Sequence, residues 1–243
     1  MIEARKNSAF ERLFLAYLKA SLRKHFAGVH VGGTESFARI DRSRPLILYG
    51  NHSNWWDGLI AFFLSQTVLH VDSYMMMEER QLRRYMFFRR LGAFSVVRES
   101  PREAVESMRY ASSLLLKPNT GVWIYPQGVM VPNDVRPLKF FQGVARLAAM
   151  HDDVQLVPVA LRYEFLMEQR PEAFALIGES GMPAGKLGPA ELTAELEKRL
   201  TALLDKLRSV VTKGELQGFT RLLSGRASVN TLHDRYRLAH ESA

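Results

Sequence analysis

The sequence predicts a single α/β domain in which helices flank a largely parallel central sheet. Short apolar runs typical of strands alternate with longer segments of helical periodicity, which is the pattern of a layered α/β fold. The chain has no Pro/Gly/Ser-rich linker, low-complexity tract or repeat, so one domain over residues 1–243 is expected. The hydrophobic fraction of 47% is ordinary for a globular protein and sufficient for a sizeable core.

An amphipathic helix is expected at the N-terminus, within residues 1–27. Its apolar residues have the spacing of one helical face: Phe10, Leu13, Phe14, Tyr17, Leu18 and Leu22. Its basic residues lie largely off that face: Arg12, Lys19, Arg23 and Lys24. Such a helix either lies on a membrane, with its cations toward lipid phosphates, or covers the protein's own core. The second role is the more common one for amphipathic helices in globular chains.

Strands and helices then alternate along the chain. The expected elements are strand 46–50, helix 55–66, strand 71–76, helix 78–91, strand 94–97, helix 102–117, strand 121–125, helix 138–150, strand 156–162, strand 174–178 and helix 189–213. Pro101 and Pro189 suit the first turns of their helices. The core of the domain is therefore expected within 46–178. The sequence after Gly214 predicts no element.

Composition and charge exclude several classes of site. The chain has no cysteine, which excludes disulfides, thiolate metal sites and a cysteine nucleophile, and which fits a reducing compartment. The formal charge of +8 suits nucleic acid, anionic lipid or acidic substrates, but a solvated basic surface would explain it equally well. No window reaches the roughly 18 apolar residues of a membrane span, and the first residues lack the apolar core of a signal peptide.

The most informative segment is LILYGNHSNWWDGLIAFF, residues 46–63. A buried strand is followed by a polar turn containing His52, and Asp57 comes five residues later in apolar surroundings. Five residues of one helix rotate by about 500°, so the two side chains would point apart if both were helical. They meet if His52 lies in a loop and Asp57 in the first helical turn, with Ser53 or Asn54 as N-cap. This strand-to-helix corner is where open α/β sheets usually bind ligands.

A histidine beside a carboxylate is the usual arrangement of a general base. The carboxylate fixes the tautomer, which leaves the other ring nitrogen free to take a proton from a hydroxyl. A helix-capping cluster with an incidental histidine is the alternative. The sequence has no Gly-x-Ser-x-Gly elbow, no His-Glu-x-x-His zinc motif and no phosphate-binding glycine loop. We therefore expect no metal ion or cofactor, and if His52 is a base, the nucleophile is the substrate's own hydroxyl.

Two further segments contain candidate ligand-binding residues that could lie near this corner. GVWIYPQGVMVPNDVRPLKFFQGVARLA, residues 121–148, predicts a strand, a Pro/Gly turn and a helix. Gly128 would let the backbone approach a ligand closely, and Arg136 and Lys139 could hold an anion, although a plain strand-turn-helix would look similar. LGAFSVVRES, residues 91–100, predicts a short strand that ends near Arg98.

In this order and spacing the segments resemble the lysophosphatidic acid acyltransferase family, the glycerolipid acyltransferases with an HX4D motif. NHSNWWD resembles the first block, GAFSVVR the second, YPQG the third and VPVAL the fourth, while FFQGVARLA is similar to the segment after the third block. The resemblance covers about residues 46–161. It implies that His52 and Asp57 are the catalytic pair and that Arg98 binds the acceptor.

The resemblance also implies the reaction. A fatty acyl thioester, on coenzyme A or acyl carrier protein, would lie in an apolar tunnel. His52 would deprotonate an acceptor hydroxyl that attacks the thioester carbonyl directly, with no acyl-enzyme and no cofactor. Backbone N–H groups near Gly128 are expected to hold the oxyanion.

The third block departs from the family's usual Phe-Pro-Glu-Gly-Thr-Arg. Gln127 stands in place of the glutamate and Met130 in place of the arginine. Methionine cannot hold a phosphate. Either Arg98, Arg136 and Lys139 carry the anion, or the acceptor is less anionic at this position. Several apolar side chains could line an acceptor site or be plain core: Trp55, Trp56 and Met75 to Met77.

The sequence thus predicts an O-acyltransferase that moves a fatty acyl group from a thioester to a hydroxyl of a lysophospholipid or similar lipid, as in phospholipid biosynthesis. The alternatives are a non-phosphate acceptor, such as a glycolipid or lipophilic alcohol, and a non-catalytic lipid-binding member. A nucleic-acid binder, suggested by the charge and by RRYMFFRR at 83–90, lacks a recognisable motif and is not expected. The expected location is cytoplasmic and peripheral on the inner face of a membrane. The predicted substrate-binding residues are Arg98, Gln127, Gly128, Arg136 and Lys139.

Overall fold

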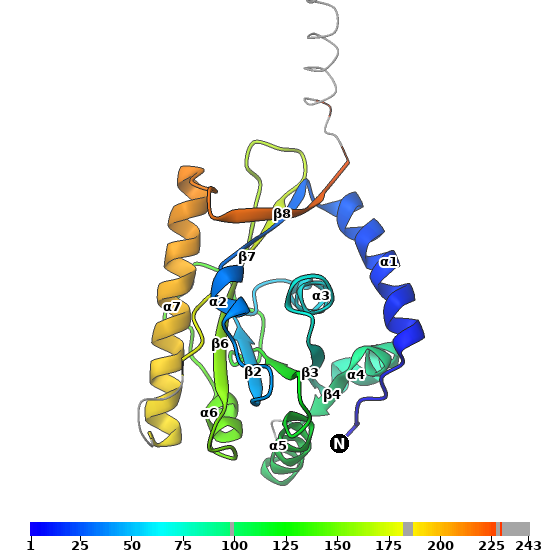
Figure 1. Ribbon diagram of the computed structural model, residues 1–243, viewed down its shortest axis with the longest axis vertical. Coiled ribbons are helices and arrows are strands. Elements are labelled where there is room, and N and C mark those ends of the chain that lie inside the picture. Colours follow the sequence, from blue (N-terminus) through cyan, green and yellow to red (C-terminus); the bar gives the residue numbers. More distant parts are fainter. Residues whose placement is uncertain (98–99, 182–186, 227–228, 230–243) are drawn as a thin grey trace, which may run out of the picture.

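An eight-stranded sheet forms the centre of the molecule (Figure 1). The computed structural model describes residues 1–97, 100–181, 187–226 and 229. The strands, in chain order, are β1 (Gly28–Gly32), β2 (Leu46–Gly50), β3 (Asp72–Glu78), β4 (Ala93–Val96), β5 (Thr120–Ile124), β6 (Gln155–Glu164), β7 (Glu172–Ile177) and β8 (Phe219–Ser224). They lie in the order β4-β3-β5-β2-β6-β7-β1-β8.

Most neighbouring strands are parallel. The pairs β4–β3, β3–β5, β5–β2, β2–β6 and β7–β1 are parallel, whereas β6–β7 and β1–β8 are antiparallel. All five residues of β2 are buried, as expected of a strand that has neighbours on both sides and helices on both faces. The predicted α/β class with a largely parallel sheet is confirmed.

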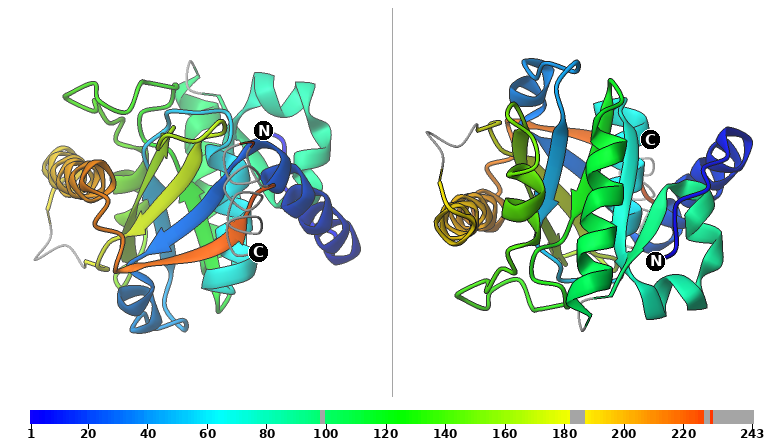
Figure 2. Two further views of the ribbon diagram at one scale, coloured as in Figure 1. Left: turned by 90° about the horizontal axis from the view of Figure 1, so that it is seen from above. Right: turned by 90° about the horizontal axis from the view of Figure 1, so that it is seen from below.

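Helices cover both faces of this sheet (Figures 1 and 2). They are α1 (Ser8–His25), α2 (Thr34–Ala38), α3 (Asp57–Leu64), the π-helix η1 (Ser65–Leu69), α4 (Glu79–Arg84), the 3-10 helix η2 (Met86–Leu91), α5 (Pro101–Leu115), α6 (Gly143–Ala148) and α7 (Pro189–Lys213). One core cluster includes residues of α1, α3 and η2, and a second, on the opposite face, includes residues of α5, α6 and α7. The side chains that α7 buries form one stripe along the helix: Leu192, Leu196, Leu200, Leu204, Leu207 and Val211.

Several predicted elements differ from those observed. Strand 46–50 and helix 189–213 are confirmed at both ends, but the predicted helix 78–91 is divided at Tyr85 into α4 and η2. The predicted helix 138–150 is wrong over its first turn, because helix α6 begins only at Gly143 and Lys139 has a positive φ of 57°. Strands β1 and β8 and the short helix α2 were not predicted, so the sheet extends beyond residues 46–178.

The N-terminal helix divides its apolar stripe between core and surface. Asn7 caps α1 by accepting a hydrogen bond from the Phe10 N–H at 2.9 Å. Leu18 and Leu22 are fully buried against the core, while Leu13 and Tyr17, on the other edge of the stripe, are 68% and 64% exposed. Helix α1 therefore covers the core with one edge and presents apolar side chains to solvent with the other.

The chain topology opens a crevice between β2 and β5. These two strands are parallel neighbours, but β2 continues through α3 to β3 on one side, and β5 continues through α6 to β6 on the other. Because α3 and α6 pack on opposite faces, the loops after β2 and β5 diverge at the carboxyl edge of the sheet. Such a switch point is the usual place for a ligand site in an open α/β sheet.

Candidate active site

His52 and Asp57 meet at this switch point. His52 lies in the loop after β2, and Asp57 is the first residue of α3. The His52 Nδ1 atom lies 2.8 Å from Asp57 Oδ2. Since a carboxylate only accepts hydrogen bonds, Nδ1 is the protonated nitrogen and Nε2 carries the free lone pair. The imidazole is 23% exposed and lines a cavity, while Asp57 is fully buried.

Backbone and side-chain donors surround the buried Asp57 carboxylate. Its Oδ2 accepts from the N–H groups of Ser53 (2.6 Å) and Asn54 (2.7 Å), and its Oδ1 accepts from the Tyr163 hydroxyl at 2.7 Å. Burial, together with the charge of Asp57, raises the pKa of Tyr163 well above its ordinary value, so this hydroxyl remains a donor. Four donors including His52 thus compensate the cost of burying this carboxylate.

The predicted N-cap at Ser53 or Asn54 is wrong. The N-cap residue of α3 is Trp56, and no side-chain hydrogen bond caps this helix. Instead, the Asp57 carboxylate accepts hydrogen bonds from the loop that precedes the helix. In that loop, Asn54 Oδ1 accepts a hydrogen bond from the Trp56 N–H at 3.1 Å. The outcome is nevertheless the expected one, since His52 is in a loop and Asp57 in the first helical turn.

Two buried amides fix the loop around His52. Gln127 Oε1 accepts the His52 backbone N–H at 2.7 Å, and Asn51 exchanges hydrogen bonds with the Leu161 backbone at 2.8 and 2.9 Å. Gln127 is only 3% exposed and is not among the residues that line the cavity. The structure thus places Gln127, predicted to bind substrate, in a supporting role in which a neutral amide serves as well as a carboxylate.

Tyr125 forms the floor under the histidine. Its ring stacks on the His52 imidazole with centroids 4.8 Å apart and planes inclined by 25°. Burial, with a smaller contribution from Asp57, raises the pKa of Tyr125 well above its ordinary value. The Tyr125 hydroxyl is buried without a hydrogen-bond partner among the described residues. Sequence reasoning missed Tyr125, Asn51 and Tyr163, because their contacts depend on the pairing of distant strands.

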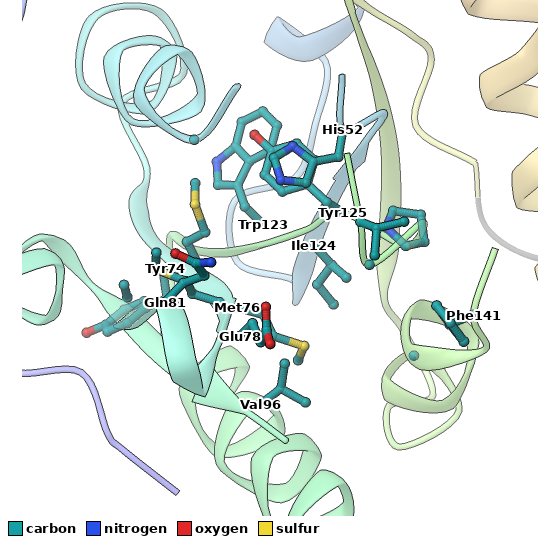
Figure 3. A pocket seen from close by; sticks show the side chains of 18 of the residues that line it. His52, Tyr74, Met76, Glu78, Gln81, Val96, Trp123, Ile124, Tyr125 and Phe141 are labelled. Carbon is teal, nitrogen blue, oxygen red and sulfur yellow. The ribbon is translucent and has the colours of Figure 1, made fainter. Parts of the chain in front are cut away.

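A cavity of about 1060 Å³ extends from His52 across the carboxyl ends of β3, β4 and β5 (Figure 3). Most of its walls are apolar, and they come from α3, β3, η2, β4, α5 and the segment between β5 and α6. Apolar lining residues include Leu59, Phe62, Met75, Met76, Met77, Phe88, Leu91, Val96, Val105, Met108, Trp123, Ile124, Val129, Met130, Phe140 and Phe141. A volume of this size is at the upper end of the range of ligand pockets and has room for a long flexible ligand.

The cavity includes some of the predicted ligand-binding residues. Gly128 lines it and has a φ of 68°, a conformation that glycine adopts without strain. Trp55 and Met75 to Met77 also line it, whereas Trp56 packs against Phe26. Met130, at the position of the family's usual arginine, lines the cavity and is 55% exposed.

The two predicted cations among the described residues, Arg136 and Lys139, lie outside the cavity lining. Arg136 forms an ion pair with Asp205 of α7 at 2.8 Å, and it does not line the cavity. Lys139 is exposed and also lies outside the lining. Arg98 lies outside the described residues. Among the described lining residues the charged side chains are Glu78 and Arg146, and neither was predicted. Their signal in the sequence is weak, since one is the last residue of a strand and the other is an ordinary helical arginine.

Within the described residues, no group of three His, Asp or Glu side chains is arranged to hold a metal ion. None of the described helices has both the length and the hydropathy of a membrane span.

Comparison with known proteins gives the family. A family model described as Acyltransferase matches residues 28–162, which is more than half of the chain. The chain belongs to the acyltransferase family. The matched region runs from β1 to β6 and contains both His52 and Asp57. The predicted family membership is confirmed.

A solved structure gives the same fold. The chain is similar to the 1-acyl-sn-glycerophosphate (LPA) acyltransferase PlsC from Thermotoga maritima, with a TM-score of 0.54, 18% sequence identity and 84% of each chain covered. No curated protein matches the sequence significantly. At this identity, the likeness to PlsC supports the fold, and the acceptor of this acyltransferase must be inferred from its own site.

Proposed function

We propose that this acyltransferase transfers a fatty acyl group from a thioester, on coenzyme A or acyl carrier protein, to a hydroxyl of a lipid acceptor. The observation that carries the proposal is the His52–Asp57 pair at the end of a large apolar cavity. The PlsC structure, whose protein acts on 1-acyl-sn-glycerophosphate by name, supports a lipid acceptor. A lysophospholipid-like acceptor would connect the chain to phospholipid biosynthesis.

In the proposed mechanism His52 acts as general base. The Nε2 atom removes the proton from the acceptor hydroxyl while the oxygen attacks the thioester carbonyl carbon. The tetrahedral intermediate then collapses, the C–S bond breaks, and the imidazolium returns the proton to the thiolate. An ester and a free thiol result. Asp57 holds the tautomer and stabilises the imidazolium.

The loop after Gly128 supplies candidates for the oxyanion donors. The Gly128 N–H itself donates to the Tyr125 carbonyl at 3.0 Å, so it closes the turn and is not available. The next two N–H groups, of Val129 and Met130, donate to no acceptor among the described residues, and both residues line the cavity. We place the oxyanion near these two groups, which refines the expectation of donors near Gly128.

The mechanism is tested by acyl transfer from a labelled thioester to a panel of lipid hydroxyls, with the products identified by mass spectrometry. His52→Ala and Asp57→Ala should each lose transfer by a factor of about a hundred to ten thousand, while their circular dichroism stays native. Near-native transfer by His52→Ala would exclude His52 as the general base. A folded wild type without transfer to any acceptor would favour the non-catalytic alternative.

We further propose that the protein works on a membrane surface. Exposed apolar side chains of α1 and η2 lie beside each other, as the Phe14–Phe87 ring contact of 5.9 Å shows. Leu13, Tyr17, Met86 and Phe87 are all at least 40% exposed. Exposed basic residues accompany them: Arg12, Arg23, Lys24, Arg83, Arg84 and Arg90. Apolar groups beside cations suit the interface of an anionic bilayer.

Vesicle co-sedimentation tests the membrane proposal. The double variant Leu13→Asp, Tyr17→Asp should bind anionic vesicles at least about tenfold more weakly, because charge replaces two inserting side chains. Leu116→Asp is the matched control, since Leu116 is 74% exposed but follows α5 instead of lying on α1. Equal binding by both variants would mean that α1 only covers the core.

A further inference from the structure

A single carboxylate and a single guanidinium lie among the described residues that line the cavity. The carboxylate belongs to Glu78, the last residue of β3, which pairs with Val96 of β4. Figure 3 shows the Glu78 side chain near Met76 and Val96, and Gln81 also lines the cavity. The guanidinium belongs to Arg146 of α6, which shares hydrogen bonds with Gln142.

Glu78 differs from its neighbour Glu79. The Glu79 carboxylate accepts from Arg83 at 2.7 and 3.0 Å and from the Ser95 hydroxyl at 3.0 Å. Glu78 is partly buried on an apolar wall, and no described side chain or backbone group donates to its carboxylate. The Glu78 carboxylate therefore keeps its acceptor capacity unused within the described part of the protein, and the hydroxyl groups of a substrate can donate to it.

We propose that the acceptor carries a neutral polyhydroxylated headgroup, such as a sugar, whose hydroxyls donate to Glu78. This inference rests on the proposed acyl transfer and names the class of acceptor. A carboxylate can accept hydrogen bonds from two neighbouring hydroxyls, and the Gln81 amide, which also lines the cavity, can both donate and accept. Glu78 is thus a specificity-determining residue that the catalytic step itself does not use.

Charge argues against the two other headgroups. Among the described lining residues, a phosphate would be attracted to Arg146 but would meet the like charge of Glu78, and at the position of the usual arginine it would find Met130. Arg136 is not available to a phosphate, because it is paired with Asp205 outside the cavity. An ammonium group would be attracted to Glu78 but repelled by Arg146. A neutral headgroup uses both the carboxylate and the guanidinium as hydrogen-bonding groups.

The aromatic lining fits the same ligand. Trp55 and Phe141 are each 57% exposed, and Tyr85 lines the cavity beside Gln81. Large aromatic faces next to a few polar groups suit a sugar ring, which has apolar C–H faces and a polar edge. A simple alkyl alcohol would use the apolar walls but would leave Glu78 without a donor.

The test compares acceptors that share one acyl chain. The probes are a glucosyl monoacylglycerol, lysophosphatidic acid with the same chain, and a long-chain amino alcohol, each assayed for kcat/KM with one acyl thioester. We expect the glucosyl acceptor to be preferred by the native enzyme. Glu78→Gln should reduce the ratio of glucosyl to phosphate kcat/KM by about tenfold to a hundredfold, since a charge-assisted hydrogen bond is lost and a repulsion is removed. A ratio is independent of the folded fraction of the variant.

Glu106→Gln is the matched control. Glu106 is exposed on α5, next to the cavity-lining Val105, but does not itself line the cavity. Its substitution removes the same charge and should leave the ratio unchanged. Preference of the native enzyme for lysophosphatidic acid or for the amino alcohol would overturn the inference, as would a ratio that Glu78→Gln and Glu106→Gln affect equally. In each of these cases acyl transfer itself would still be observed, whereas failure of the proposed function would abolish transfer to all three probes.

Discussion

Two His–carboxylate pairs lie in the described part of the molecule, and they differ in the surroundings of the histidine ring. His52 Nδ1 is 2.8 Å from Asp57 Oδ2, and its ring lines the cavity. His30 Nε2 is 3.1 Å from Glu172 Oε2, but His30 lies within β1, is 8% exposed and stacks on Phe174. A carboxylate partner alone therefore does not distinguish the two histidines. Of the two, His52 follows the carboxyl end of a strand and lines the cavity, where its other nitrogen can reach a substrate.

The electrostatics of the two pairs also differ. Asp57 has four donors, of which two are backbone N–H groups of its own loop. Glu172 is held by His30 and by Arg221, whose Nη2 lies 3.6 Å away on β8. The Asp57 cluster orients the ring of the proposed base, whereas the Glu172 cluster joins three strands, β1, β7 and β8.

The largest effect should come from exchanging the two histidines for alanine one at a time. His52→Ala removes the base and should lower kcat by a factor of about a hundred to ten thousand. His30→Ala should leave kcat within about twofold of the native value and lower the melting temperature instead, because it creates a small cavity between strands. Acyl transfer assays and thermal unfolding on both variants check this. A strong loss of kcat in His30→Ala would contradict the distinction between the pairs.

A smaller effect is expected at Gln127, which supports His52 from behind. Gln127→Leu leaves the His52 backbone N–H without its 2.7 Å acceptor, at a cost of about 1–3 kcal/mol in the free energy of unfolding, and should lower activity roughly tenfold as the loop shifts. Gln127→Glu retains an acceptor and is the control, expected to lose less than Gln127→Leu on both measures. Urea unfolding measures the stability of the two variants, and acyl transfer rates measure their activity. Equal losses in Gln127→Leu and Gln127→Glu would refute the supporting role of Gln127.

The sequence predicts the geometry of the His52–Asp57 corner well because its signals are local. The strand 46–50, the polar turn and the early helical Asp57 are adjacent in the chain, so spacing alone places His52 against Asp57. The acceptor side could not be predicted in this way. Arg136 was a reasonable anion ligand by position, but α7 supplies Asp205 from about seventy residues later and neutralises it. Glu78 gains its meaning only when β3, β4 and β5 bring their carboxyl ends together.

The missed strands have the same cause. Strand β1 is GVHVG, whose two glycines and histidine dilute the apolar signal, and β8 contains an arginine and a threonine that point away from the core. Each is stabilised by its neighbours, since β1 lies between β7 and β8. The sequence LKFF at 138–141 predicts the start of a helix, but Leu138 packs in the core and Phe140 and Phe141 line the cavity from an irregular segment.

The Glu172 pair should show itself in the pH dependence of stability. His30, and to a smaller extent Arg221, holds the pKa of Glu172 below its ordinary value of 4.5. A pKa that is lower in the folded state means that the pair stabilises the fold above pH 4.5, and that this contribution is lost as the pH falls through the folded-state pKa. Glu172→Gln should thus cost about 1–2 kcal/mol at neutral pH and progressively less in acid. Urea unfolding over a pH series measures this, and a constant difference would exclude the ion pair as its source.

The smallest effect is expected at the two tyrosines beside the catalytic pair. Both are buried, and burial raises the pKa of each well above its ordinary value, but only the Tyr163 hydroxyl has a partner among the described residues, the Asp57 Oδ1 atom at 2.7 Å. Tyr125→Phe removes a hydroxyl that is buried without a hydrogen bond and keeps the ring that stacks on His52. It should raise the free energy of unfolding by up to about 1 kcal/mol and leave kcat unchanged. Tyr163→Phe removes a donor from the Asp57 carboxylate and should lower both stability and kcat. Chemical denaturation and transfer rates on the two variants compare them directly. If Tyr125→Phe proved the more harmful of the two, the Tyr125 hydroxyl would have a role in catalysis, because its removal breaks no described hydrogen bond within the protein.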